Sequence, residues 1–112
     1  MGNYQLGFKC KIDELIHALA NHCGIEGPVI LSNKDAEGAI MTLLNLVGSG
    51  HLYGGGGDTG APSEHMCNKY IKSVECIFEG NDRVVIVRLT VDEDNIKELA
   101  PCAKKLQNII SA

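Results

Sequence analysis

The strongest strand signal in this sequence is Val84-Val85-Ile86-Val87-Arg88-Leu89-Thr90-Val91. The stretch is rich in β-branched residues, and apolar side chains occupy both sets of alternating positions, which is typical of a central strand. Turn residues precede it at Gly80-Asn81-Asp82. Before this turn, the residues from Ile71 to Glu79 alternate between apolar and polar. The two runs together predict an antiparallel hairpin.

The N-terminal half predicts two further strands and a helix between them. Residues 4–10 alternate as in a half-buried strand, and the short apolar run at residues 29–31 indicates a buried one. Apolar residues step by three and four from Ile12 to Cys23, which predicts an amphipathic helix. Gly24 is well placed as the left-handed C-terminal cap of that helix.

A second helix is predicted from the capping box Ser32-Asn33-Lys34-Asp35 to about Val47. Apolar residues cover much of its circumference, so we expect it to be buried on more than one side. In a chain this small, the second side is available for another subunit. One hypothesis is therefore a non-catalytic oligomeric subunit or adaptor, a homo-oligomer or a partner subunit, with this helix and the hairpin as its interface.

The C-terminal segment predicts a last helix, capped by Asp92, whose apolar positions from Ile96 to Ile110 keep one phase. Pro101 lies inside it, and we expect a kink or a break there because proline removes a backbone hydrogen bond. The predicted order is β-α-β-α-loop-β-β-α, in a single domain over residues 1–112. The fold class is α/β, arranged as an α+β sandwich of a four-stranded mixed sheet and three main helices.

Composition and charge narrow the classes of partner. Ten Lys and Arg oppose 14 Asp and Glu, which gives a net charge of −4 without any basic run, so we expect no nucleic-acid binding. No apolar run approaches the roughly 20 residues of a membrane span, so no membrane partner is expected. Five cysteines, an odd number without a visible signal peptide, predict reduced thiols and a cytoplasmic location.

Residues 48–60 hold seven of the 13 glycines and predict a glycine-rich loop. Glycine allows backbone amides to approach an anion closely, and long loops are commonly functional. The phosphate-loop signature G-x-x-x-x-G-K-[ST] is absent. The first hypothesis is a ligand-binding or regulatory module whose loop closes over a polar or anionic small molecule. Its candidate ligand-binding residues are Ser32, Asn33, His51, Gly54, Gly55, Gly56, Gly57, Asp58 and Thr59.

Cys10 is the candidate nucleophile of a third hypothesis, a thiol enzyme or sulfur carrier. It ends a strand directly before a helix, where amide dipoles lower a thiol pKa, and Lys9 and Lys11 flank it. The predicted element order resembles that of the small sulfur-carrier proteins, which place a cysteine before their first helix. Their Cys-Pro-x-Pro pattern is absent, since Lys11-Ile12-Asp13 follows Cys10. The alternative is that Cys10 continues the buried face of its strand.

His65 and Cys67 are the candidate metal ligands, because nitrogen and sulfur donors suit zinc. No C-x-x-C pair and no His-x-x-x-His accompanies them, so a surface histidine beside a half-buried cysteine is the simpler interpretation. The residues imply no particular cofactor. They also show no arrangement typical of an enzyme, which favours a binding protein over a catalyst.

Overall fold

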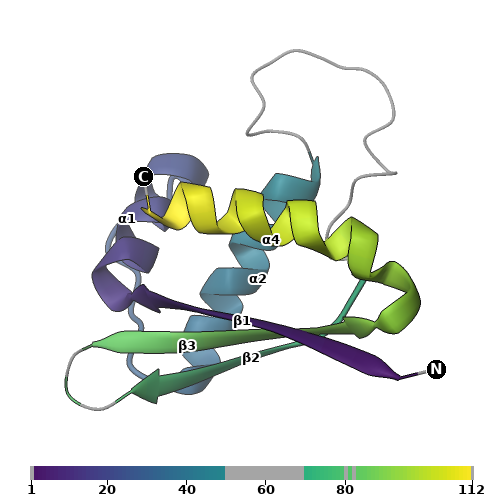
Figure 1. Ribbon diagram of the computed structural model, residues 1–112. Helices are drawn as coiled ribbons and strands as arrows, with labels where there is room; N and C mark the ends of the chain where they lie inside the picture. The colour runs from purple at the N-terminus through teal and green to yellow at the C-terminus, as the bar shows by residue number, and fades with distance from the viewer. Residues whose placement is uncertain (1, 50–69, 80, 82, 112) are drawn as a thin grey trace.

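The computed structural model describes residues 2–49, 70–79, 81 and 83–111, which form an α+β fold (Figure 1). Its strands are β1 (Asn3–Lys11), β2 (Ile71–Glu79) and β3 (Val84–Asp92). Its helices are α1 (Ile12–Cys23), α2 (Asn33–Ser49) and α4 (Ile96–Ser111), and a 3₁₀ turn at Glu93–Asn95 leads into α4. The three predicted main helices are therefore confirmed.

The sheet has three antiparallel strands in the order β1-β3-β2. This confirms the predicted hairpin and the central place of β3, but the predicted fourth strand and mixed sheet are wrong. Residues 29–31 join no strand of the described sheet. Ile30 is buried, whereas Val29 and Leu31 are 69% and 76% exposed. The Leu31 amide donates to Asp35 Oδ2 at 2.9 Å, so the helix cap takes a hydrogen bond that a strand would give to its neighbour.

Helices α1 and α4 lie over one face of the sheet, and α2 runs beside β2 (Figure 1). No helix among the described residues covers the other face (Figure 1). On the covered face, the β3 side chains Val85, Val87, Leu89 and Val91 are fully buried. The alternate β3 residues are only half-buried. The predicted central place of β3 is confirmed, although the described helices cover only one of its two faces. A β-branched run has the same sequence signature whether its second face meets a helix or only the side chains of neighbouring strands.

The open face is covered in part by long polar side chains. Ile77 and Ile86 are directly paired across β2 and β3 on this face. Lys9 of β1 and Glu79 of β2 form an ion pair at 3.2 Å, although β3 lies between their strands. The ion pair must therefore span the central strand. Such exposed ion pairs each contribute about 0–1 kcal/mol to stability. Their long side chains mainly serve to cover the apolar residues of this face.

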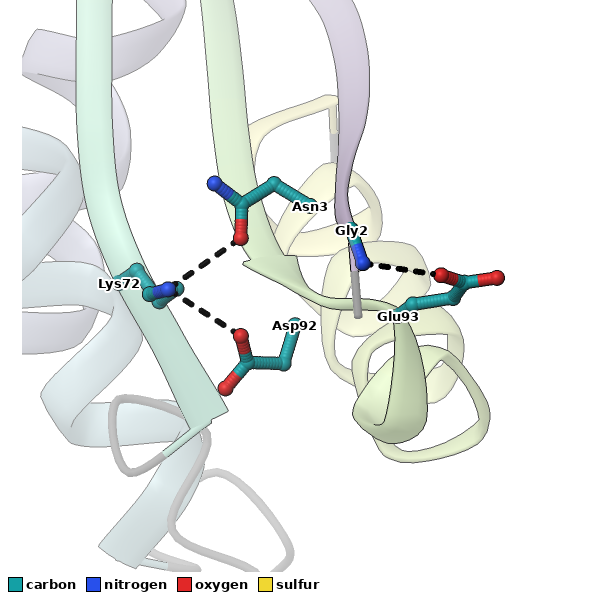
Figure 2. Close-up of polar contacts among 5 residues, drawn as sticks. All are labelled: Gly2, Asn3, Lys72, Asp92 and Glu93. Carbon is teal, nitrogen blue, oxygen red and sulfur yellow. Dashed lines mark hydrogen bonds and ion pairs between the residues drawn. The ribbon is translucent and has the colours of Figure 1, made fainter.

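A second set of polar contacts ties the other end of the sheet (Figure 2). Lys72 of β2 donates to Asn3 Oδ1 at 3.2 Å and to Asp92 Oδ1 at 3.1 Å. Beside it, the Gly2 amide donates to Glu93 Oε1 at 3.2 Å. Asp92 occupies the predicted capping position, but its side chain makes no capping hydrogen bond. The predicted side-chain cap is wrong because the carboxylate is engaged by Lys72 on the sheet.

The apolar stripe of helix α2 packs against other elements of the same chain. It contacts β2, α1 and α4, and its predicted stripe of Ile40, Leu43, Leu44 and Val47 is buried in the common core. The expectation of burial on more than one side is confirmed, and the neighbours belong to the same chain. The apolar stripe is therefore not free to form a subunit interface.

Most predicted helix ends match the structure. Gly24 has φ +69° and caps α1, and the Asp35 amide donates to Ser32 Oγ at 3.1 Å at the start of α2. Helix α2 continues through Gly48 to Ser49, two residues beyond the predicted end. Helix α4 is one element from Ile96 to Ser111, so Pro101 does not break it.

Among the described residues, we find no helix with the length and apolarity that a membrane span requires.

We predict opposite stability effects for two glycine-to-alanine substitutions. A Cβ at Gly38 of α2 would meet no atom within 4 Å, so Gly38→Ala should raise the free energy of unfolding by about 1 kcal/mol through helix propensity. Gly24→Ala should lower it by about 1 kcal/mol, because alanine is strained at φ +69°. Urea unfolding measures both, and a destabilising Gly38→Ala would contradict the open space described at this position.

Candidate functional site

Ser32 and Asn33, two predicted ligand-binding residues, make structural hydrogen bonds at the start of α2. Ser32 Oγ accepts from the Asp35 amide at 3.1 Å, and Asn33 Oδ1 accepts from the Phe78 amide of β2 at 3.0 Å. The Asp35 carboxylate already sits at this helix terminus, where the Leu31 amide, foremost, holds its pKa below the usual value. The Ser32 and Asn33 side-chain oxygens are thus already engaged within the protein.

The other predicted loop ligands, His51, Gly54, Gly55, Gly56, Gly57, Asp58 and Thr59, lie outside the described residues. So do the candidate metal ligands His65 and Cys67. Residue 50 follows the far end of α2, roughly 24 Å along the helix from Asn33 at 1.5 Å per residue. Ser32 and Asn33 thus lie at the opposite end of α2 from the start of that segment.

Cys10 lies on the covered face of β1 and is buried at 6% exposure. Burial, and to a smaller extent the nearby Glu14 carboxylate, raise its pKa from 9.0 to about 12. Cys76 of β2 is also buried, and its pKa rises to about 12, mainly through burial and then through Glu37. These environments disfavour the thiolate, which is the reactive form.

The remaining described cysteines differ from each other. Cys23 is a half-buried free thiol whose pKa burial raises. Cys102 is disulfide-bonded, so the prediction that every cysteine is reduced is wrong for this residue. Within the described part of the chain, no group of three or more His, Cys, Asp or Glu side chains could hold a metal ion.

A groove of about 380 Å³ lies between α2 and β2. Its residues on the helix are Lys34, Glu37, Gly38 and Met41, and those on the strand are Ile71, Lys72, Ser73 and Val74. Its volume falls within the range of small-molecule sites, roughly 300–1,000 Å³. The groove combines an aliphatic lining with the ammonium groups of Lys34 and Lys72, the Ser73 hydroxyl and the Glu37 carboxylate. Its two positive charges exceed its one negative charge, which suits a ligand that is apolar at one end and anionic at the other.

Some charged side chains of the groove already have a hydrogen-bonding partner within the protein, and one does not. Glu37 accepts a hydrogen bond from the Cys76 amide at 3.1 Å, and the Lys72 ammonium is held by Asn3 and Asp92 (Figure 2). Lys34 is exposed and makes no hydrogen bond or ion pair with any described residue. Its ammonium group is therefore the charge that a ligand could neutralise at the lowest cost.

Sequence reasoning missed this groove, although one signal was present. Lys34, Gly38 and Met41 recur at the spacing of one helical face, opposite the apolar stripe. A glycine inside a helix, away from a capping position, destabilises the helix by about 1 kcal/mol relative to alanine. Its presence there often indicates that another group packs closely against the backbone or that the space beside it has a function. The strand that completes the groove is more than 30 residues away in sequence and could not be paired with this face by pattern alone.

The chain matches no protein-family model, and neither the curated proteins nor the solved structures include a significant match to it.

We predict slow alkylation of Cys10 and Cys76 in the folded protein near neutral pH. Burial limits access, and their pKa of about 12 keeps the thiolate fraction small until the pH is far above 9. Cys23, which is half-buried, should react first of the three free thiols, and all three should react quickly in urea. Mass-spectrometric peptide mapping after timed alkylation measures the order. Fastest reaction at Cys10 would instead support the thiol-enzyme hypothesis.

Proposed function

We propose that this protein is a ligand-binding module that takes a polar or anionic small molecule in the groove between α2 and β2. The observation that carries this proposal is the unengaged Lys34 ammonium beside a groove of about 380 Å³. The walls contributed by Met41, Ile71 and Val74 favour a short aliphatic body attached to the anionic group.

The proposed function is binding without catalysis. The thiols of Cys10 and Cys76 are buried with raised pKa values, which disfavours their use as nucleophiles. A glycine-rich loop that closes over the ligand and a cytoplasmic location stay predictions. The absence of nucleic-acid partners also stays a prediction, and it agrees with the open sheet face, whose described strand residues include no aromatic side chain.

We test the groove with butyrate, which joins a carboxylate to a short aliphatic chain. Butyrate should shift the amide NMR signals of Val74 and Gly38, and Lys34→Gln should weaken its binding about three- to tenfold through loss of a charge-assisted hydrogen bond. Lys104→Gln on α4 is the matched control, since it removes one exposed positive charge outside the groove. Signal changes that are absent, or equal in both variants, would reject the groove as an anion site.

A second candidate function is a homo-oligomeric subunit. The connection between α1 and α2 exposes three large apolar side chains, namely Ile25 at 41%, Val29 at 69% and Leu31 at 76%. Exposed apolar side chains gathered in one segment often mark a protein–protein contact.

Sedimentation at micromolar concentration tests this second candidate. If the wild-type chain is a dimer through this segment, replacing Val29 and Leu31 with serine should convert it to the 12.0 kDa monomer. Replacing the exposed Met41 with serine should not, because Met41 lies in the groove and not in this connection. A wild-type monomer would leave the oligomeric hypothesis without support.

A further inference from the structure

Two side chains of α2 occupy the outer edge of β2. Asn33 Oδ1 accepts from the Phe78 amide at 3.0 Å, and Glu37 Oε2 accepts from the Cys76 amide at 3.1 Å. These contacts show that α2 runs antiparallel to β2. Four helix residues advance about 6 Å and two strand residues about 6.8 Å, so the two spacings nearly match. Each step of four residues along α2 thus meets the next outward amide of β2.

The next step in this series pairs Met41 with Val74, and both residues line the groove. The pairing register of β2 is continuous from Ser73 to Glu79, so the Val74 amide points away from β3 as the Cys76 and Phe78 amides do. A thioether is only a weak acceptor. Within the described residues, Val74 has no hydrogen bond on its outward side. The third acceptor of the series is therefore missing where the groove opens.

Val74 offers both a donor and an acceptor. In an antiparallel ladder, the amide and the carbonyl of one residue point to the same side, so Val74 presents both groups to the groove. A simple anion uses the amide alone. One residue of an extended peptide uses both, because it exchanges two hydrogen bonds with the residue opposite. The paired donor and acceptor thus distinguish a peptide from a free anion.

We propose that the groove binds an extended peptide that carries a carboxylate and pairs with the β2 edge at Val74. This inference rests on the proposed function, since it names the ligand class of the same groove. An antiparallel peptide runs from the Glu37 end of the groove toward Ile71, so its carboxylate lies near Lys34 on the N-terminal side of the residue that pairs with Val74. Apolar side chains of the peptide contact Met41 and Ile71. Glu37 occupies the next amide, and the register of β2 shifts between Ile71 and Ser73, so regular pairing is confined to the stretch around Ser73 and Val74 and the peptide is short.

The substitution that tests the pairing is Met41→Gln, which supplies the missing side-chain oxygen. It should accept a hydrogen bond from the Val74 amide and slow the hydrogen exchange of that amide, as Glu37 does for Cys76. Met41→Leu has a similar size without an acceptor and should leave Val74 exchanging fast. Met41 is 40% exposed, so both variants should fold, which circular dichroism verifies.

The probe is a tripeptide of glutamate, alanine and valine with an acetylated N-terminus and an amidated C-terminus, which places the carboxylate on the N-terminal side of the chain. We expect Met41→Gln to bind it at least tenfold more weakly than Met41→Leu does. Methylation of the peptide amide that donates to the Val74 carbonyl should weaken binding about tenfold. Replacing the glutamate of the probe with glutamine removes the carboxylate and should weaken binding about three- to tenfold. Equal binding of the two probes would contradict the carboxylate contact at Lys34.

Equal binding of the methylated and unmethylated peptides would overturn strand pairing. If butyrate still bound under that outcome, the groove would be an anion site and the proposed function would stand without the peptide. If neither the peptide nor butyrate bound, both proposals would fail.

Discussion

The hydrogen bonding of β3 on both of its edges is the constraint on which the structure depends. Because β1 and β2 both pair with it in antiparallel register, the three strands present one continuous apolar face. The helices must cover that face, since Val85, Val87, Leu89 and Val91 of β3 are fully buried there. Burial of apolar surface, rather than the exposed ion pairs of the other face, accounts for most of the stability.

The same arrangement makes β2 an edge strand, and the edge determines where α2 lies. An unpaired edge exposes backbone amides that favour pairing with another chain. Asn33 and Glu37 satisfy two of these amides from α2, at 3.0 Å and 3.1 Å. Gly38 and Met41 leave space and no strong acceptor beyond them, so protection of the edge ends where the groove begins. Edge protection and the candidate site are thus two parts of one helix–strand contact.

The sequence patterns predicted the fold more accurately than they predicted the site, and the site residues show why. Ser32 and Asn33 were predicted as ligand contacts because polar residues at a helix start suit anions. In the structure, Ser32 caps its own helix, and Asn33 binds a strand 45 residues away. Lys34 was not predicted as a site residue, because an exposed lysine on a helix is common. Lys34 becomes a candidate ligand contact only through its position beside β2, which the tertiary structure determines.

The sequence by itself determined the local elements, because periodicity and capping act over a few residues. The strand alternation of Ile71–Glu79, the apolar phase of α2 and the left-handed cap at Gly24 are of this kind. The tertiary structure decided whether residues 29–31 joined the sheet, which face of β3 stayed open, and where α2 met the edge of β2. These outcomes depend on contacts between residues far apart in the chain, whose competing hydrogen bonds and packing no local pattern records.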